Sequence, residues 1–312
     1  MFLHVDAYPG DPILTLNEDF QKDPRQDKIN LSIGIYFDNE GRLPVMRAVR
    51  EAESSLLAKI APKPYLPMTG HVGYRQAVQE LLFGADHEAV RSGRIATIQT
   101  LGGSGGLKVG GDFLKRYVPE SQVWVSDPTW DNHKAIFEGA GFQVNTYPYY
   151  DAATKGLKFD AMLAAIDALP AKSIVLLHAC CHNPTGIDYT AEQWAAIAEA
   201  FATSGTFPII DSAYQGLGHG MEEDAAGMRA VLAAVPEAFI AYSCDKNFGQ
   251  YRDRVGAFYV MAQDQGALDT AFSNANALAR AGWSMPPDHG GAAVRIILRD
   301  PDMTAQWLAE LD

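Results

Sequence analysis

The sequence lacks the features of a membrane or secreted protein. No apolar run approaches the roughly 20 residues that a membrane-spanning helix needs. The first residues have no basic region followed by an apolar core and a small-residue cleavage site, as a signal peptide would. Cysteine is scarce, and Cys180, Cys181 and Cys244 form a poor disulfide framework that fits a reducing cytosol. We therefore expect a cytoplasmic protein with no membrane partner.

Positive charge is also scarce. The 312 residues include 25 Lys and Arg against 38 Asp and Glu, which gives a formal net charge of −13. This balance argues against general nucleic-acid binding, which requires a basic face, although a few local cations can still hold a small anion. The chain is 47% hydrophobic and has no internal repeat, so we expect one large domain, or one large and one small.

From Arg94 onward, β-branched apolar runs alternate with amphipathic segments. Strands are predicted at 94–100, 122–127, 142–149, 173–179, 207–211 and 238–243, and helices at 105–117, 132–140, 159–168, 190–202 and 222–234. This alternation indicates an α/β fold, a mostly parallel sheet with helices on both faces. The apolar run 256–261 follows too soon for a crossover helix, so one strand is predicted to be antiparallel.

The two ends of the chain depart from this alternation. Up to about Asp38 the chain is rich in Asp and Pro and is predicted to be irregular, and a helix is predicted within 44–60. Residues 301–312 have helical spacing and stop without a C-cap, which fits either an interrupted chain or a frayed natural terminus. The apolar face of this last segment comprises Met303, Trp307, Leu308 and Leu311.

Polar residues that can bind a ligand or take part in catalysis follow several of the predicted strands. Ligands of parallel sheets bind beyond the carboxyl ends of the strands. The glycine turn 102–106 opens a helix and is suited to a phosphate, but a tight turn explains it nearly as well, because both the P-loop and the dinucleotide fingerprint are incomplete. Trp130 follows the next strand and either stacks on a planar ligand or caps the core.

The predicted strand 173–179 is followed by "CCHNPTG", residues 180–186. Its cysteines and histidines, with His178, resemble metal ligands, but their spacing is too short for a usual zinc site, and no metal is predicted. Asn183 is better placed to present its amide from a rigid loop. At the end of the predicted strand 207–211, Asp211 needs a cationic or hydrogen-bonded partner unless it is a helix N-cap, and Tyr214 follows it.

The predicted strand 238–243 is followed by Lys246, with Ser243 and Arg254 nearby. Desolvation and a neighbouring cation can lower the pKa of such a lysine and make it a nucleophile. Pyridoxal phosphate is one ligand that uses all these parts together. It would take a Schiff base from Lys246, a ring stack from Trp130 and a carboxylate from Asp211 at its ring nitrogen, while the glycine turn and its neighbours hold the phosphate.

Ordered motifs along essentially the whole chain resemble the class I, fold-type I aminotransferases. They are most similar to the bacterial aromatic amino acid aminotransferases, a sister group of the aspartate aminotransferases. The motifs are "VDAYPGDPILTL", "INLSIGIYFDNEG", "YLPMTG", "TIQTLGGSGGLKVGGDFLKRY", "VWVSDPTWDNHKAIF", "CCHNPTGID", "DSAYQG", "GMEEDAAGMR", "SCDKNFGQYRDRVGA" and "ARAGWSMPPDHG".

The resemblance implies specific roles for residues of this sequence. Lys246 would hold the cofactor and move the substrate proton, Asp211 would keep the ring nitrogen protonated, and Tyr214 would act beside them. The implied cofactor-binding residues are Gly103, Ser104, Trp130, Asn183, Asp211, Tyr214, Ser243, Lys246, Arg254 and, from the partner subunit, Tyr65. The implied substrate-binding residues are Gly34, Trp130, Asn183 and, from the partner subunit, Arg280. His133 and His178 would contact these residues rather than the ligand itself.

The resemblance also implies an organisation and an activity. The expected parts are an N-terminal arm with part of a small domain (1–45), a cofactor-binding large domain (46–300) and the start of a truncated C-terminal small-domain segment (301–312). The expected homodimer shares its active sites. It moves the amino group of an aromatic or dicarboxylic amino acid to a 2-oxo acid such as 2-oxoglutarate. The alternatives are a weakly active or inactive cofactor-binding relative and an oxidoreductase, which leaves Lys246, Asp211 and Asn183 without roles.

Three features depart from the family pattern. Asp245 stands where the family has a small residue, most often serine. Its carboxylate would repel a phosphate unless it turns away or pairs with Arg252 or Arg254, and a pair with Lys246 would instead raise the lysine pKa. Gln250 stands where an apolar residue is usual. The family also continues beyond residue 312 with an arginine for the substrate α-carboxylate, so we expect no residue here in that role.

Overall fold

The computed structural model describes residues 2–6, 12–30, 34–59, 61–84 and 86–312. The chain divides into two compact units, Met1–Pro44 and Val45–Asp312. Parts of the motifs quoted from 5–16 and 29–41 lie outside the described residues. The predicted assignment of 1–45, 46–300 and 301–312 to separate domain parts stays a prediction.

The first unit contains a helix that the sequence analysis missed. Helix α1 spans Pro12–Lys22, within the stretch that we expected to be irregular. Proline is favoured at the first position of a helix, and Lys22 lies in the last turn, where a cation complements the helix dipole. The expectation was wrong because Pro12, one of the residues that made the stretch look irregular, occupies the first position of a helix.

The second unit is built on a seven-stranded sheet. Its strands, in spatial order, are β1 (Ile95–Leu101), β9 (Val255–Met261), β8 (Ala238–Ser243), β7 (Phe207–Ser212), β6 (Ile174–His178), β2 (Val123–Asp127) and β3 (Val144–Pro148). Strand β9 is antiparallel to both of its neighbours, and the pairs from β8 to β3 are parallel. The predicted mostly parallel sheet with one antiparallel strand is confirmed. A small hairpin, β4 (Tyr150–Asp151) with β5 (Gly156–Leu157), lies apart from this sheet.

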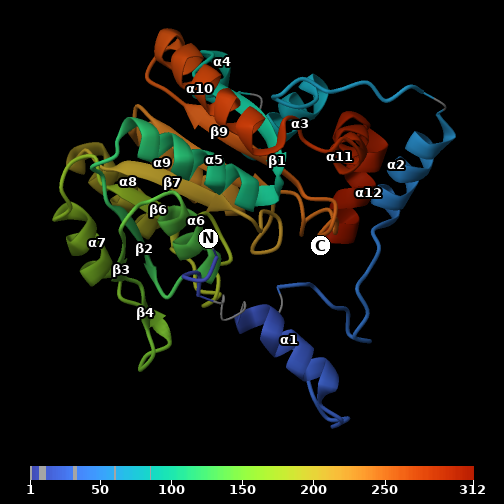
Figure 1. Cartoon of the computed structure of the whole chain (residues 1–312), viewed down its shortest axis with the longest axis horizontal. Coiled ribbons are helices and arrows are strands. Elements are labelled where there is room, and N and C mark those ends of the chain that lie inside the picture. Colours follow the sequence, from blue (N-terminus) through green and yellow to red (C-terminus); the bar gives the residue numbers. More distant parts are fainter. Residues whose placement is uncertain (1, 7–11, 31–33, 60, 85) are drawn as a thin grey trace. The chain divides into compact units, whose positions relative to one another are not determined.

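Helices cover both faces of the sheet, as Figure 1 shows. The helices of the second unit are α2 (Arg47–Ala58), α3 (Val72–Phe83), α4 (Glu88–Arg91), α5 (Gly102–Tyr117), α6 (Asp131–Gly139), α7 (Phe159–Asp167), α8 (Ala191–Ser204), α9 (Glu223–Ala234), α10 (Gln265–Trp283), α11 (His289–Arg299) and α12 (Pro301–Leu311). Local sequence sets their ends: α8 begins with a capping box between Thr190 and Gln193 and ends at left-handed Gly205.

Two apolar cores form, one on each face of the sheet. In β6, Val175 and Leu177 belong to one core, while Ile174 and Leu176 belong to the other. Side chains alternate between the faces of a strand, so a strand buried on both faces must be apolar throughout. This explains the continuous apolar run that identified the strand in the sequence.

Helix α12 packs its tryptophan into the first core. Trp307 is fully buried, its ring stacks on Phe248 at 4.3 Å between centroids, and its Nε1 donates to the Asn247 carbonyl at 2.7 Å. The helix therefore braces the turn that follows β8. Leu308, predicted on the same apolar face, is instead 36% exposed, because the burying side of α12 is set by its packing on α2 and α11.

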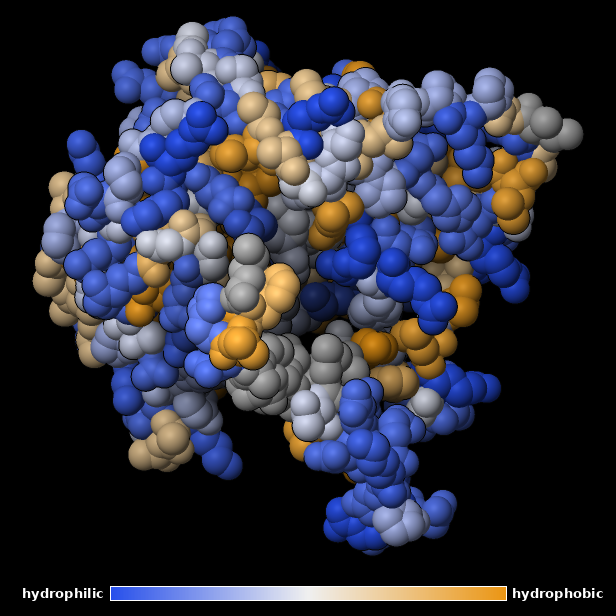
Figure 2. Space-filling view, viewed as in Figure 1, coloured by the Kyte–Doolittle hydropathy of each residue, from blue (hydrophilic) through white to orange (hydrophobic). Residues whose placement is uncertain are grey.

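Several large apolar side chains remain on the surface of the second unit. Val45 is 75% exposed, Leu57 79% and Val72 51%. Orange patches of this kind interrupt the blue surface in Figure 2. Within the described part of the chain, no helix combines the length and the apolar character needed to cross a membrane.

Candidate active site

One edge of the sheet collects the predicted site. Helix α5 starts where β1 ends, Trp130 and Asn183 follow the ends of β2 and β6, and Asp211 lies next to the end of β7. Lys246 follows the end of β8. Strand β9 runs the other way, so its first residue, Val255, and the preceding Arg254 lie at the same edge. Parallel strands present their carboxyl ends together, and this brings residues far apart in the sequence into one region.

Lys246 occupies the turn between β8 and β9. Its Nζ lies 4.5 Å from the centre of the Tyr214 ring. Burial lowers the pKa of Lys246, the carboxylates of Asp211 and Asp245 oppose this shift, and Arg254 adds to it. Desolvation disfavours the ammonium form, so the site favours a neutral, nucleophilic amine more than water does.

Asp211 is held by a chain of buried hydrogen bonds. His133 Nε2 lies 2.9 Å from Asp211 Oδ2, and His133 Nδ1 lies 2.8 Å from Thr129 Oγ1. Thr129 Oγ1 lies 3.2 Å from His178 Nε2, whose ring receives the backbone N–H of Asn183 at Nδ1 over 3.5 Å.

One set of tautomers satisfies this whole chain of bonds. A carboxylate only accepts, so His133 Nε2 donates to Asp211, and His133 Nδ1 accepts the Thr129 hydroxyl proton. Thr129 can then accept from His178 Nε2–H, while His178 Nδ1 accepts from Asn183. Burial lowers the pKa of His178 well below its usual range, which agrees with a neutral ring. The chain fixes one oxygen of Asp211 and leaves the other for a ligand.

The second Asp211 oxygen has no hydrogen-bond partner among the described residues. Oδ1 is buried, although an unsatisfied carboxylate oxygen is costly away from water. A Cβ built on Gly103 would lie 3.7 Å from this oxygen and 3.5 Å from the Ser243 Cβ. Because Gly103 carries no side chain, the space beside Oδ1 stays open. Asp211 lies within β7 and caps no described helix, so the N-cap alternative is wrong.

Asn183 and Tyr214 come together from two strand ends. Asn183 Nδ2 donates to the Tyr214 hydroxyl oxygen at 3.3 Å. Burial raises the pKa of Tyr214 to about 12, and the nearby Asp211 carboxylate adds to the shift. The phenol therefore keeps its proton at neutral pH and remains a hydrogen-bond donor.

The start of α5 meets Arg254 and Asp245. Gly102 has a left-handed φ of +66°, and a Cβ there would collide with Arg254 Nη2 and lie 2.8 Å from Asp245 Oδ2. Only glycine fits this approach. Ser243 is buried, and its Oγ accepts the backbone N–H of Asp245 at 3.1 Å. Three predicted phosphate-binding residues, Gly103, Ser243 and Arg254, therefore lie together at the positive end of a helix dipole.

Asp245 pairs with Arg254 rather than with Lys246 or Arg252. Its Oδ2 accepts a hydrogen bond from Arg254 Nη1, and its Oδ1 accepts the Val255 backbone N–H at 3.1 Å. Burial raises the pKa of Asp245, and the charge of Arg254 opposes that shift most strongly. Of the alternatives left open by the sequence, the tertiary structure selects the pair with the predicted phosphate ligand.

These residues fit pyridoxal phosphate. The free Oδ1 of Asp211 offers an acceptor to a protonated ring nitrogen, and Lys246 offers a desolvated amine. The start of α5 offers backbone N–H groups to a phosphate. Trp130 is half-buried, packs against the second core and meets His133 edge-to-face at 5.2 Å, so its role in the core is established, and its stack on a ring stays a prediction.

The other predicted residues differ in their exposure. Ser104 is half-buried in the first turn of α5. Tyr65 is 91% exposed, and the exposed Arg280 donates to Ser284 Oγ at 2.7 Å in the last turn of α10. The exposure of Tyr65 and Arg280 agrees with the expectation that they bind ligands in the active site of a partner subunit. Gly34 belongs to the first unit, and its substrate role stays a prediction.

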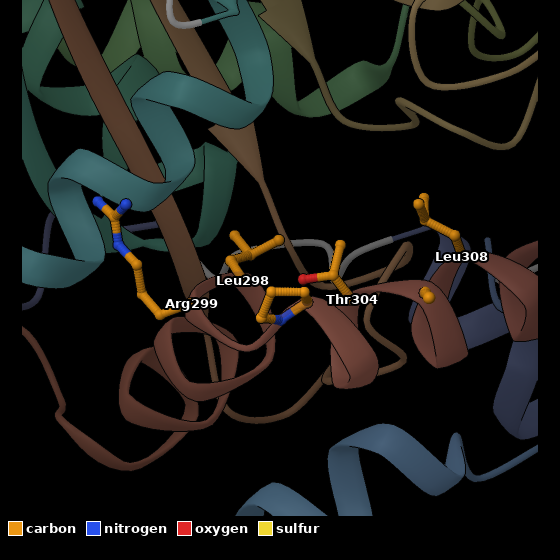
Figure 3. Close-up of a pocket in the computed structure, with 6 residues that line it drawn as sticks. Leu298, Arg299, Thr304 and Leu308 are labelled. Carbon is orange, nitrogen blue, oxygen red and sulfur yellow. The ribbon is translucent and has the colours of Figure 1, made fainter.

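Two further features lie apart from the cluster. Among the described residues, no group of three or more His, Cys, Asp or Glu side chains is arranged to hold a metal ion. A pocket of about 450 Å³ between the end of α11 and α12 is lined by Leu298, Arg299, Pro301, Thr304, Ala305 and Leu308. Figure 3 shows Arg299 at one end of this row and Leu308 at the other, and none of the six is a predicted site residue.

The sequence analysis missed two residues that the geometry makes important. Thr129 links His133 to His178, and its position four residues before His133, directly after the β2 end, was the available signal. Gly102 makes the close approach to Arg254, whereas the predicted residue Gly103 lies beside Ser243 and Asp211. The sequence shows a glycine after the predicted strand, but it does not show that Arg254 lies against this glycine.

Comparisons with known proteins agree with one another. The family model described as "Aminotransferase class I and II" matches residues 26–312. The chain is 53% identical to the aromatic-amino-acid aminotransferase of Escherichia coli K12, covering 100% of this chain and 79% of that protein. It is 44% identical to the aspartate aminotransferase of Pseudomonas aeruginosa, covering 100% and 78%. The solved Burkholderia pseudomallei aromatic-amino-acid aminotransferase, covalently bound to pyridoxal phosphate, matches with a TM-score of 0.97 at 44% identity, covering 100% and 78%.

Proposed function

The chain belongs to the aminotransferase class I and II family, and on that premise we propose that the cluster around Lys246 is its active site. The protein is a pyridoxal-phosphate-dependent aminotransferase. It moves an amino group from an amino acid to a 2-oxo acid, so that the donor becomes a 2-oxo acid and the acceptor an amino acid. The observation that carries the site assignment is a half-buried lysine with a lowered pKa, Lys246, near a buried carboxylate, Asp211, with one oxygen left for a ligand.

When bound, pyridoxal phosphate supplies an aldehyde that takes up amines and a ring that withdraws electrons from the substrate. The residues of the chain prepare this chemistry. Lys246 Nζ, with its lowered pKa, is the base that takes a proton from the substrate carbon and returns it. Asp211 Oδ1, oriented through His133, holds the proton on the ring nitrogen. Asn183 and Tyr214 present donors to the ring's phenolic oxygen.

The phosphate ligands in this proposal are Gly103, Ser104, Ser243 and Arg254, with Tyr65 of the partner subunit. Support comes from the start of α5, where backbone N–H groups and the helix dipole favour an anion. The substrate side comprises Gly34, Trp130, Asn183 and the partner subunit's Arg280, and the last would meet a dicarboxylic substrate.

We further propose that aromatic amino acids are the preferred donors and 2-oxoglutarate the acceptor. The higher identity to an aromatic-amino-acid aminotransferase, 53% against 44% for the aspartate enzyme, supports this order. Steady-state rates with tyrosine and with aspartate, each with 2-oxoglutarate, test it. A higher kcat/KM with aspartate would reverse the order.

A homodimer and a cytoplasmic location complete the proposal. Exposed Tyr65 and the exposed apolar side chains Val45, Leu57 and Val72 support the dimer, because large exposed apolar groups mark contact surfaces. Cys180, Cys181 and Cys244 are free thiols, which supports a reducing compartment. Sedimentation of the cofactor-loaded protein would give its mass directly.

Borohydride trapping tests the assignment of Lys246. The protein is incubated with pyridoxal phosphate, reduced, digested and mapped by mass spectrometry. We expect the pyridoxyl label on Lys246, because its amine is the one that burial makes less basic. The variant Lys246→Ala should lose the label and the visible absorption of the bound cofactor, whereas Lys108→Ala, which removes a lysine paired with Asp112 on α5, should keep both.

Mapping of the label to another lysine would overturn the assignment. Addition of tyrosine or aspartate to the unreduced protein then separates an active enzyme from a weakly active or inactive cofactor-binding relative. An active enzyme converts its visible spectrum to that of the amine form of the cofactor. A spectrum that stays unchanged identifies the inactive relative.

A further inference from the structure

Asp245 occupies an anion position within the phosphate cradle, by which we mean Gly102, Gly103, Ser243 and Arg254. Its Oδ2 would lie 2.8 Å from a Cβ on Gly102, the first residue of α5. The carboxylate therefore stands at a helix N-terminus, where backbone N–H groups and the helix dipole attract negative charge. A phosphate is expected to seek the same position.

The carboxylate also engages the cradle's only strong cation among the described residues. Arg254 Nη1 donates to Asp245 Oδ2 and, at 2.9 Å, to the Tyr251 carbonyl, so both of its N–H groups are in use. Arg254 Nη2 lies 3.5 Å from the Leu101 carbonyl. A guanidinium binds phosphate best through two parallel N–H groups, and this arrangement restricts that mode.

Asp245 is held firmly in this position. It is 5% exposed, and its Oδ1 accepts the Val255 backbone N–H at 3.1 Å. Its own backbone N–H donates to Ser243 Oγ at 3.1 Å, which engages a second predicted phosphate ligand. Two of these bonds, to Arg254 and to the Val255 N–H, hold the carboxylate itself, so a rotation that moves it away from Arg254 must break both.

We propose that Asp245 is an internal counter-anion that competes with the cofactor's phosphate for Arg254 and so weakens the affinity of this chain for pyridoxal phosphate. The inference rests on the proposed function, because it takes the cradle as the phosphate site. Asp245 also opposes the lowered pKa of Lys246, but that effect acts alike on pyridoxal phosphate and on pyridoxal, so a comparison of the two ligands isolates the phosphate arm. The opposite role, in which Asp245 orients Arg254 for the phosphate, predicts the opposite sign.

Equilibrium titrations with pyridoxal phosphate and with pyridoxal, which lacks the phosphate, test the competition. Asp245→Asn keeps the shape of the side chain and removes its charge. Asp245→Ser shortens the side chain and removes the carboxylate that pairs with Arg254. We expect each variant to lower the Kd for pyridoxal phosphate by about tenfold or more, because a buried like charge beside the phosphate is removed. The Kd for pyridoxal, which shares only the effect of the charge on Lys246, should change much less, so the ratio of the two Kd values should move in favour of pyridoxal phosphate.

Asp253→Asn is the matched control, since it removes one negative charge from the same turn, and none of the hydrogen bonds or ion pairs of the Arg254 side chain among the described residues involves Asp253. It should leave the ratio of the two Kd values unchanged. An unchanged or higher Kd for pyridoxal phosphate in the Asp245 variants overturns the proposal. Borohydride mapping of the same samples keeps the two questions apart: a label on Lys246 with unchanged Kd values defeats only the competition, and no label on Lys246 in any variant defeats the site assignment as well.

Discussion

At the scale of single residues, the buried histidines beside Asp211 show how neutral groups orient a charge. His133 is fully buried and donates to Asp211 Oδ2, while Thr129 and His178 fix its tautomer. The second oxygen, Oδ1, keeps no partner among the described residues. A protein that leaves a buried carboxylate oxygen unsatisfied accepts a loss of stability, which a ligand at that oxygen can recover.

Replacement of Asp211 should separate activity from stability. Asp211→Asn removes the charge that holds a proton on the cofactor ring, and we expect kcat to fall by about 10²–10³-fold, as for the loss of one preorganised electrostatic contact. The urea midpoint should not fall, since Asn keeps the acceptor for His133 and removes a buried charge.

Transamination rates and urea unfolding of the same samples measure both effects. Asp167→Asn, at an exposed aspartate in the last turn of α7, is the control and should change neither. An Asp211→Asn enzyme with kcat near that of the unaltered protein would contradict the role assigned to this carboxylate.

At the scale of elements, the site depends on how closely α5 approaches β9. Strand β9 lies beside β8, and the start of α5 packs directly over its first residues. A Cβ on Gly256 would lie 2.5 Å from the Gly102 carbonyl carbon and 2.5 Å from the Tyr242 carbonyl oxygen. Both atoms belong to the backbone, so neither can rotate away.

Gly256→Ala should therefore lower the free energy of unfolding by about 1–3 kcal/mol, the usual cost of overpacking. It should also weaken pyridoxal phosphate binding, because the start of α5 must move. Gly139→Ala is the matched control: its Cβ would meet nothing within 4 Å, and alanine favours a helix more than glycine does. Urea unfolding of both variants measures the difference, and equal stability for the two would refute the close approach.

A second element, α12, supports the turn that carries Lys246. Trp307 stacks on Phe248 and donates to the Asn247 carbonyl, so the turn is held from outside the sheet. Asn247 Nδ2 donates in turn to the Gln215 carbonyl and to the Tyr242 hydroxyl oxygen. These contacts restrict the backbone beside Lys246 without touching its amine, which keeps the amine free for chemistry.

At the scale of the whole molecule, burial of neutral histidines couples stability to pH. Burial lowers the pKa of His182 to about 3, and nearby His133 adds to the shift. The pKa of His178 is also lowered well below its usual range. A histidine in the unfolded chain titrates near about 6.5, so below that pH the unfolded state binds more protons than the folded state. Stability from these groups is complete above about pH 6.5 and is lost as the pH falls.

We expect the free energy of unfolding to fall by about 1.4 kcal/mol per pH unit for each of these histidines below about pH 6. His182→Asn should reduce this slope by one histidine's share, even though it loses the bonds to Ser126 and Thr185. Urea unfolding between about pH 7.5 and about pH 5 measures the slope, because a histidine in the unfolded chain changes charge within this range. The control is His219→Asn, at an exposed histidine, and a His182 variant with the full slope would contradict this account.

Much of the architecture followed from local pattern. Strands β6 and β7 were predicted from apolar runs, because burial on both faces leaves no room for polar alternation. Helix α1 was not predicted, since a proline signals a helix start only when the residues after it are helical. The exposure of Leu308 was also not predicted, because α2 and α11, distant in the sequence, decide which side of α12 is buried.

The sequence by itself determined the α/β fold, the family and the positions of Lys246, Asp211 and Asn183 at strand ends, because these depend on periodicity and on the order of motifs along the chain. Only the tertiary structure decided which cation Asp245 pairs with, since Lys246, Arg252 and Arg254 are all within reach along the sequence. It also decided the route by which Thr129 and two histidines orient Asp211. The physical reason is that a pairing between side chains depends on distance and direction in space, and the sheet brings together residues that the chain separates.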